Sequence, residues 1–457
     1  MRRVAKRAWI MMVFVTVLLG GMLFFLYEYA AKSGDWVISA GSPHVYSGSN
    51  MNCGVITDRE GLLLLDTREG RIYSKDRDIR RGTLHWVGDR SGNIHAAAVT
   101  HYAKEMAGFD LLNGVYSYGG AGGQTKLTLS AQVQKAALAA LGDRKGVVAV
   151  YNYKTGEILC AVSTPTFDPD NVPDISGDTT GRYDGVYLNR FTQSTYIPGS
   201  TFKIVTTAVA LETVADIEEM TFTCSGIREY GIDRVTCERA HGAQDLKTAL
   251  ANSCNCAFAE ISALVGRDSM MEYVDRFGLT ESVSFDGITT AAGNYDVSVA
   301  APVELAWSCI GQYTDQMNPC TFLAFLGAVA NDGAGAKPYV VSQITVGEDT
   351  TYRARQETMP RIMSKELARS LQELMRNNVV AKYGADRFAG LTVCAKSGTS
   401  ELGGGLAPNA MFAGFAMDEE YPLAFVVVVE NGGYGAATCI PVIAPVLAAC
   451  RTVIDGK

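Results

Sequence analysis

The N-terminal hydrophobic pattern is an uncharged run at residues 8–27, which follows four basic side chains within the first seven positions. Twenty apolar residues can span a bilayer, whereas the core of a secretory signal is about 7–15 residues long. Basic residues flank the cytoplasmic end of such spans. We therefore predict a single-pass anchor in the cell membrane, with residues 1–7 in the cytoplasm and the rest outside. A cleaved signal peptide is the alternative.

The later hydrophobic pattern mixes helical and strand periodicity, which predicts an α/β domain. A helix is expected from about Ser130, because Gln134, Ala137, Leu138 and Leu141 share one face. Apolar runs of strand length follow, and the last two should pair antiparallel across a short polar loop. The expected strands are residues 147–151, 391–395, 410–416 and 423–430, and a closing helix is expected at residues 439–452.

The segment between the span and this domain has a different pattern, with short β-like runs and turn residues from about residue 42. A glycine-rich stretch at residues 118–123 predicts a linker. We therefore expect a small β-rich, non-catalytic module at residues 28–123 and a larger domain at residues 124–457. A chain of 457 residues, 47% of them apolar, suffices for both.

Charge and cysteine content exclude some functions. The formal net charge is −8, and the basic residues before the span leave the remainder more acidic still. Nucleic-acid binding needs a basic face, so we expect no nucleic-acid partner. Eleven cysteines leave at least one unpaired within the chain. Cys254 and Cys256 lack the partner ligands of a zinc site, so neither a metal nor another cofactor is expected.

Candidate chemistry begins at Ser200 and Lys203, at the start of an apolar helical pattern. Positions i and i+3 share a helix face, so the amine can reach the hydroxyl. A neutral lysine can take the serine proton, and burial would lower its pKa and favour that neutral form. Alone, this S-x-x-K spacing is a weak signal, since about two matches are expected by chance in a chain of this length.

Two further motifs follow in order along the chain. The first is S-x-N at Ser253 and Asn255, and the second is K-S-G-T, which begins at Lys396. Together with S-x-x-K they resemble the active-serine set of penicillin-binding proteins and serine β-lactamases. A Pro-Gly step before the serine and a Gly-Gln step at residues 311–312 add to the resemblance, which covers roughly residues 120–457.

The N-terminal module resembles the non-catalytic pedestal of class B penicillin-binding proteins. The stretch from Cys53 to Gly61 is similar to its opening R-G-x-I-x-D-R-x-G hairpin, although Cys53 replaces the first arginine. The module is too short for the glycosyltransferase domain of the bifunctional class. The resemblance implies an α/β (α+β) transpeptidase fold, in which helices flank an antiparallel sheet and an all-helical subdomain is inserted between residue 167 and about residue 385.

The family's reaction is acyl transfer from a D-alanyl-D-alanine stem peptide, and the resemblance implies a role for each motif. Ser200 would be the nucleophile and Lys203 its base, with Lys396 helping to keep Lys203 neutral by like-charge repulsion. Ser253 would relay a proton to the leaving amine. The backbone N–H groups of Ser200 and Thr399 would form the oxyanion hole.

Substrate binding is implied for the remaining motif residues. Asn255 offers a donor and an acceptor to the substrate amide. The K-S-G-T segment is expected on an edge strand, where the substrate backbone can pair as an added strand. There Gly398 would leave space for the substrate, and the hydroxyls of Ser397 and Thr399 would bind its terminal carboxylate.

The resemblance also implies partners and a covalent link. Similar penicillin-binding proteins often carry a cysteine pair at the position of Cys224 and Cys237, which implies a disulfide; two reduced, half-buried thiols are the alternative. The implied partners are peptidoglycan stem peptides, β-lactam antibiotics and a separate membrane glycan polymerase.

The leading hypothesis is a membrane-anchored D,D-transpeptidase of the class B type, inhibited by β-lactams. A D,D-carboxypeptidase or a β-lactamase would share acylation at Ser200 but resolve the ester with water. A non-enzymatic penicillin sensor is the second alternative. Such a sensor would need several spans or a cytoplasmic effector domain, and the pattern shows one apolar run of spanning length.

Overall fold

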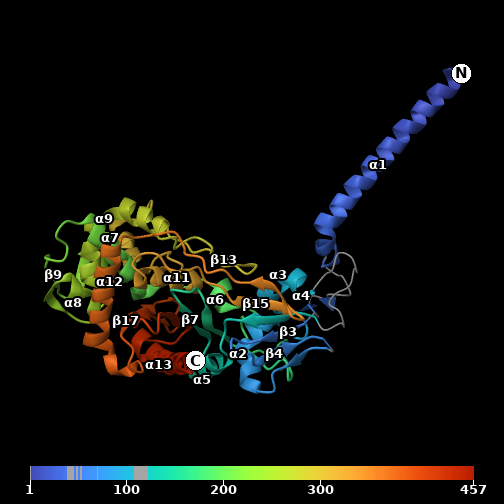
Figure 1. Ribbon diagram of the computed structural model, residues 1–457. Coiled ribbons are helices and arrows are strands. Elements are labelled where there is room, and N and C mark those ends of the chain that lie inside the picture. The colour runs from blue at the N-terminus through green and yellow to red at the C-terminus, as the bar shows by residue number, and fades with distance from the viewer. Residues whose placement is uncertain are drawn as a thin grey trace.

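A computed structural model shows one long N-terminal helix, α1 (Arg2–Val37), that projects away from a two-part body (Figure 1). The last turns of α1 meet the body, where Lys104 pairs with Asp35 at 3.0 Å. Cys53 and most of the predicted linker lie outside the described residues. The structure describes residues 2–38, 46–47, 50–51, 54–68, 70–107 and 122–456.

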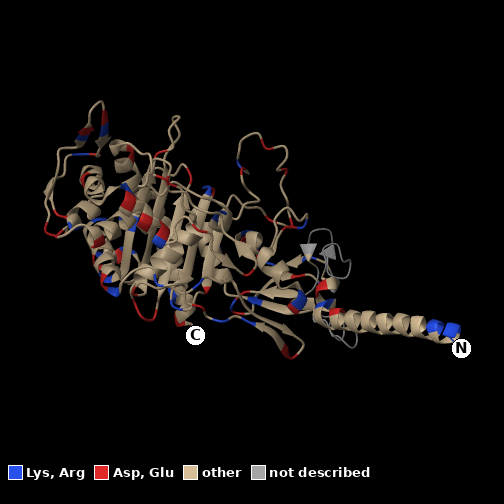
Figure 2. Cartoon of the chain, turned by 90° about the horizontal axis from the view of Figure 1, so that it is seen from above, with Lys and Arg blue, Asp and Glu red and all other residues tan. Residues whose placement is uncertain are grey.

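The α1 helix is long and apolar enough to cross a membrane over Arg2–Trp36, and none of its most apolar window is buried. Figure 2 shows basic residues at its free end and uncharged residues along most of its length. Among the described residues a second helix, α13 (Gly435–Asp455), passes the same test. Its apolar side chains, such as Ile440 and Ile443, are buried against the central sheet, so α13 is a core helix.

A six-stranded sheet forms the part of the body nearest α1, in the order β16-β15-β6-β3-β4-β5. Its central strand β3 pairs antiparallel with β4 and parallel with β6. Strands β15 and β16 come from more than 200 residues later in the chain. The predicted module at residues 28–123 is therefore not self-contained, because its sheet is completed by later strands. The strands are β3 (Val55–Thr57), β4 (Leu63–Asp66), β5 (Ile72–Tyr73), β6 (Gln124–Leu127), β15 (Val341–Val346) and β16 (Asp349–Arg353).

A five-stranded antiparallel sheet, in the order β17-β18-β19-β7-β8, lies at the centre of the larger part. Alternate residues of β7 enter two cores: Val148 and Val150 belong to the core that α5 (Ala131–Leu141) and α13 cover, and Val147 and Ala149 to the core on the opposite face, which α11 (Pro319–Ala330) covers. The strands are β7 (Gly146–Asn152), β8 (Ile158–Thr164), β17 (Val393–Ser400), β18 (Asn409–Ala416) and β19 (Leu423–Val429).

The chain between β8 and β17 forms most of the helices (Figure 1). The prediction of an all-helical insertion was wrong, because this segment also carries β9–β16, and β15 and β16 join the six-stranded sheet. These are α6 (Arg190–Gln193), the 3-10 helix η1 (Gly199–Phe202), α7 (Lys203–Thr213), α8 (Leu246–Ala251), α9 (Asn255–Arg276), α10 (Pro302–Cys309), α11, α12 (Lys365–Asn378), the π-helical turn η2 (Val379–Tyr383) and the 3-10 turn η3 (Ala385–Arg387).

Short strands and helices complete both parts. Two β-ribbons beside α9, β9 with β12 and β10 with β11, matter for the site described below. The elements are β1 (Tyr46–Ser47), β2 (Asn50–Met51), α2 (Arg77–Val87), α3 (Ala97–His101), α4 (Ala103–Ala107), β9 (Phe222–Cys224), β10 (Ile227–Tyr230), β11 (Asp233–Thr236), β12 (Gly242–Gln244), β13 (Ser284–Phe285) and β14 (Ile288–Thr289).

Candidate active site

Ser200 lies in η1, a tight turn that leads directly into α7. The turn packs against the edge strand β17. Its Gly199 has φ +53°, a left-handed conformation that favours glycine. A Cβ atom at Gly199 would lie 2.6 Å from the carbonyl oxygen of Thr399. Glycine therefore lets the turn that carries Ser200 approach the strand closely.

Gly398 serves the same close contact from the strand side. A Cβ at this position would lie 2.7 Å from the carbonyl oxygen of Pro198 and 3.0 Å from Cγ2 of Thr201. The space that Gly398 leaves is thus filled by the turn around Ser200. The expectation that Gly398 also leaves space for a substrate stays a prediction.

Lys203, the first residue of α7, is fully buried and points its amine at the other motif residues. Its Nζ lies 3.0 Å from Oγ of Ser200, 2.8 Å from the carbonyl oxygen of Ser253 and 2.7 Å from Oδ1 of Asn255. Burial lowers the pKa of Lys203 to about 7, and nearby cysteines offset part of this effect. The amine can therefore be neutral near physiological pH.

Lys396 on β17 supplies a second buried amine. Its Nζ lies 3.0 Å from Oγ of Ser253 and donates to the carbonyl oxygen of Ser397 at 2.9 Å. Burial, and then the charge of Lys203, holds the pKa of Lys396 well below its ordinary value. The charge of Lys203 therefore disfavours protonation of Lys396.

Ser253 occupies the loop between α8 and α9 with φ +53°, which is uncommon for a residue with a side chain. Its hydroxyl lies between the two amines, 3.2 Å from Nζ of Lys203 and 3.0 Å from Nζ of Lys396. The next residue, Cys254, caps α9, because its sulfur accepts from the N–H of Ala257 at 3.4 Å. The cap fixes where the loop enters the helix.

Asn255 begins α9, and both ends of its amide have protein partners. Its Oδ1 accepts from Lys203, and its Nδ2 donates to the carbonyl oxygen of Thr236 at 2.7 Å. Asn255 therefore joins the buried lysine to the end of β11. The sequence predicts that the Asn255 amide binds the substrate. A substrate would then have to replace either Lys203 or Thr236 as the partner of that amide.

The K-S-G-T segment lies on β17, the edge strand of the central sheet, as expected. Tyr383 from η2 covers part of this edge: its hydroxyl accepts from the N–H of Ser397 at 3.0 Å and lies 2.9 Å from the Ser397 hydroxyl. Oγ1 of Thr399 accepts from the N–H of Gly435 at 3.1 Å. Both hydroxyls expected to bind a carboxylate thus have protein partners.

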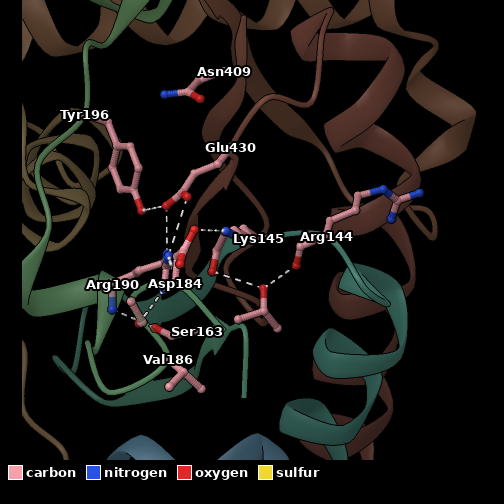
Figure 3. Close-up of polar contacts among 12 residues, drawn as sticks. Arg144, Lys145, Ser163, Asp184, Val186, Arg190, Tyr196, Asn409 and Glu430 are labelled. Carbon is pink, nitrogen blue, oxygen red and sulfur yellow. Dashed lines mark hydrogen bonds and ion pairs between the residues drawn. The ribbon is translucent and has the colours of Figure 1, made fainter. Parts of the chain in front are cut away.

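A charged pair, Arg190 and Glu430, contacts Tyr196 in the chain that leads to η1 (Figure 3). Arg190, whose side chain is 5% exposed, donates from Nε to Oε1 of Glu430 at 2.7 Å. The hydroxyl of Tyr196 donates to the same oxygen at 2.9 Å. Sequence reasoning left Glu430 without a role, because its partners lie more than 200 residues earlier.

The expected disulfide between Cys224 and Cys237 is not formed in the structure, where both are free thiols. The sulfur of Cys237 instead lies 3.7 Å from that of Cys254, and the sulfur of Cys224 lies 3.5 Å from Nδ1 of His241. The sulfur atoms converge from separate elements, which the spacing of the cysteines along the chain could not reveal.

Comparisons with known proteins agree on the kind of domain. The model of the penicillin binding protein transpeptidase domain matches residues 146–448. The peptidoglycan D,D-transpeptidase PbpA of Mycolicibacterium smegmatis is 32% identical over 342 residues, which cover 68% of each chain. A crystal structure of the D,D-transpeptidase domain of a peptidoglycan glycosyltransferase from Eggerthella lenta has a TM-score of 0.75 at 26% identity and covers 88% of this chain and 98% of that one.

A further solved structure concerns an assembly. It is described as showing the structural coordination of polymerization and crosslinking by a peptidoglycan synthase complex. The TM-score is 0.60 at 26% sequence identity, and the match covers 72% of this chain and 63% of that one.

Proposed function

The chain belongs to the penicillin-binding protein transpeptidase family, and from this premise we propose that it is a serine D,D-transpeptidase that cross-links peptidoglycan stem peptides and is inhibited by β-lactams. The family and the α/β transpeptidase fold expected from the three sequence motifs are confirmed. The roles of individual residues are the content of the proposal.

The observation that carries the proposal is the 3.0 Å separation between Oγ of Ser200 and Nζ of the buried Lys203. A neutral amine has two N–H donors, and the carbonyl oxygen of Ser253 and Oδ1 of Asn255 lie close enough to accept both. The lone pair of the amine is then left to accept the Ser200 proton. Lys203 is thereby arranged as the base that activates the nucleophile.

Acylation follows from this arrangement. Lys203 takes the proton of Ser200 while Oγ bonds to the carbonyl carbon of the penultimate D-alanine. The N–H groups of Ser200 and Thr399 are the proposed oxyanion donors, each worth about 2.7–4 kcal/mol of barrier by analogy with other acyl-transfer enzymes. The C–N bond then breaks, and Ser253 passes a proton from the lysines to the departing D-alanine amine.

The second half-reaction resolves the ester. The amine of a neighbouring stem peptide attacks the carbonyl carbon and gives up a proton to the neutral Lys203. Lys203 passes this proton to Oγ of Ser200 as the ester C–O bond breaks, and the cross-link is formed. Edge strand β17 is the proposed docking site for the donor backbone. The hydroxyls of Ser397 and Thr399 remain the proposed ligands of the terminal carboxylate, and Ser397 must then exchange its contact with Tyr383.

The proposed location is the cell membrane, with α1 as a single span, residues 1–7 in the cytoplasm and the catalytic domain outside. Support comes from the apolar surface of α1 and the basic residues at its free end. We also propose a separate membrane glycan polymerase as partner, which agrees with the likeness to a peptidoglycan synthase complex.

The first test is intact-mass spectrometry of the full chain in detergent after incubation with benzylpenicillin. A stable adduct of one drug molecule is expected, and it should be absent from Ser200→Ala. The matched control is Ser262→Ala, because Ser262 is a buried serine of α9 whose hydroxyl donates to the carbonyl oxygen of Ala259. Failure of the wild-type chain to form an adduct would refute the assignment of Ser200.

A second experiment separates transfer from hydrolysis. The enzyme is incubated with a stem peptide ending in D-alanyl-D-alanine and an excess of an acceptor amine, and the products are weighed by mass spectrometry. Cross-linked product is expected. A tetrapeptide alone would indicate a D,D-carboxypeptidase, and rapid turnover of a chromogenic cephalosporin would indicate a β-lactamase.

A further inference from the structure

Four potential metal ligands gather beside the S-x-N loop, outside the proposed catalytic roles. The sulfur atoms of Cys224, Cys237 and Cys254 and a ring nitrogen of His241 all lie within 4.8 Å of one another. Cys224 and Cys254 are buried, and Cys237 and His241 are partly exposed. The sequence showed no partner ligands for Cys254, but the fold supplies three of them, and the prediction that no metal is bound is therefore revised.

Two β-ribbons bring the ligands together. Strand β12 pairs with β9 so that Gly242 lies opposite Cys224, and this places His241 beside Cys224, with a backbone hydrogen bond of 3.2 Å between them. The β10–β11 hairpin is closed by the N–H of Cys237, which donates to the carbonyl oxygen of Gly226 at 2.9 Å. The cap of α9 adds the fourth ligand, Cys254.

Two of the six separations between ligand atoms match a tetrahedral zinc site, and all six are within 4.8 Å. With Zn–S bonds of about 2.3 Å and Zn–N bonds of about 2.0–2.1 Å, tetrahedral angles require about 3.8 Å between two sulfurs and about 3.6 Å between sulfur and nitrogen. The observed distances are 3.7 Å for Cys237 and Cys254, and 3.5 Å from Cys224 to Nδ1 of His241. A disulfide, in contrast, requires about 2.05 Å between sulfurs.

We propose that Cys224, Cys237, His241 and Cys254 bind a structural Zn²⁺ ion. Three thiolates and one imidazole are a ligand set that zinc prefers, and four protein ligands leave no open position for a substrate. Each thiol loses its proton to solvent on binding, and the neutral imidazole donates its Nδ1 lone pair.

Backbone donors around the sulfurs suit thiolate ligands. The N–H of Cys256 donates to the sulfur of Cys237 at 3.3 Å, and the N–H of Ala257 donates to the sulfur of Cys254 at 3.4 Å. Such contacts hold metal ligands in place and stabilise their negative charge. Both donors belong to the first turn of α9, where the helix dipole also favours anions.

The zinc ion would act on the catalytic loop by positioning it, an effect that rests on the proposed function. Cys254 stands between Ser253 and Asn255, so a fixed Cys254 restrains both neighbours. Asn255 also donates to the carbonyl oxygen of Thr236, the residue before Cys237. The ion therefore links the S-x-N loop to the β10–β11 hairpin. Because Cys254 follows Ser253 directly, its binding also restrains the positive φ of Ser253.

The test begins with metal analysis of the full chain, purified in detergent under reducing conditions and incubated with zinc alone. About one zinc ion per chain is expected after removal of free metal. His241→Ala and Cys237→Ser should each reduce the content at least about tenfold. The matched control is Cys450→Ser, a buried cysteine of α13 outside the cluster, which should retain the zinc.

Cobalt substitution is measured on the wild-type chain, so the result does not depend on whether the variants fold. Co²⁺ bound at the site should show the intense visible bands of tetrahedral coordination and thiolate charge-transfer bands. Bands typical of octahedral Co²⁺, or a zinc content that neither His241→Ala nor Cys237→Ser reduces, would overturn the proposal. So would an intact mass under native conditions that is two hydrogens short and maps to a disulfide at Cys237.

Penicillin acylation separates this proposal from the catalytic one. Ser200→Ala should keep its zinc and lose the adduct, whereas His241→Ala should lose its zinc and still acylate, at least about tenfold more slowly. Loss of zinc with an unchanged acylation rate would overturn the positioning role. Zinc binding without any adduct in the wild-type chain would refute the catalytic assignment and leave the metal site standing.

Discussion

The hydroxyl oxygen of Ser253 lies 3.0 Å from Nζ of Lys396, and it is the same oxygen that lies 3.2 Å from Nζ of Lys203. When one of these two buried amines is protonated, its charge opposes protonation of the other. Ser253 is therefore placed to move a proton between the lysines and the leaving group.

Replacement of Ser253 by alanine should slow acylation by benzylpenicillin about 10²–10⁴-fold, the range that a positioned proton-transfer group contributes. Ser200 and Lys203 stay in contact, so a slow adduct should still form. The rate is followed by mass spectrometry or with a fluorescent penicillin. Ser262→Ala on α9 is the control. If Ser253→Ala slowed acylation no more than Ser262→Ala does, the role of Ser253 in proton transfer would be contradicted.

The rate constant for acylation should rise with pH through about pH 7 and then level off. Burial lowers the pKa of Lys203 to about 7, and only the neutral amine can accept the Ser200 proton. Below this pKa the protonated amine cannot act as a base, so the rate falls as pH falls. The pKa of Lys396 is also held well below its ordinary value, by burial and then by the charge of Lys203.

The measurement is the second-order rate constant for benzylpenicillin from about pH 5 to about pH 9, at one ionic strength. The Lys203 amine faces Ser200, Ser253 and Asn255, which do not titrate in this range. The titratable groups around it are Lys396, across the Ser253 hydroxyl, and the nearby cysteines, which raise its pKa. A flat profile, or a rate that decreases through neutrality, would exclude Lys203 as the base.

Local sequence pattern predicted three strands of the central sheet well, placed the start of β17 within the expected strand at residues 391–395, and missed β8. The expected strand at residues 147–151 is β7 (Gly146–Asn152), and the expected strands at residues 410–416 and 423–430 are β18 and β19. The order of the three motifs also predicted which side chains meet, because motif spacing in a family reflects its fold. Ser200, Lys203, Ser253, Asn255 and Lys396 do meet.

Local sequence pattern did not predict contacts between segments that are distant in the chain. Strands β15 and β16 join the sheet of the N-terminal module. Local periodicity can predict a strand but does not predict which strand it pairs with. The carboxylate of Glu430 meets Arg190 in the same way. The four sulfur and nitrogen ligands converge only when two β-ribbons close, so Cys254 alone gave no sign of a metal.

Gly398→Ala should reduce acylation at least about 10²-fold, because misplacement of a reacting group by about 1 Å has effects of that size. The new Cβ would lie 2.7 Å from the carbonyl oxygen of Pro198, a backbone atom that can yield only if the turn holding Ser200 moves. The thermal unfolding midpoint should change little, since the strand keeps its hydrogen bonds. A loss of acylation that merely parallels global unfolding would contradict this local explanation.

Glu430→Gln should lower the free energy of unfolding by about 1–3 kcal/mol, because it leaves the guanidinium of Arg190 buried without its counter-charge. The estimate is below that for a fully buried pair, since the Glu430 side chain is 22% exposed and solvent screens part of the interaction. Figure 3 shows the pair together with Tyr196, which lies four residues before Ser200. Part of the acylation rate should therefore be lost as well, through a looser turn.

The control for this prediction lies in the same view. Lys145 pairs with Asp184 at 3.2 Å, but the Asp184 side chain is 74% exposed, so Asp184→Asn should change the free energy of unfolding by less than about 1 kcal/mol. Urea unfolding of both variants in detergent gives the comparison. If the two substitutions proved equally mild and Glu430→Gln acylated at the wild-type rate, the buried pair would not anchor the chain before Ser200.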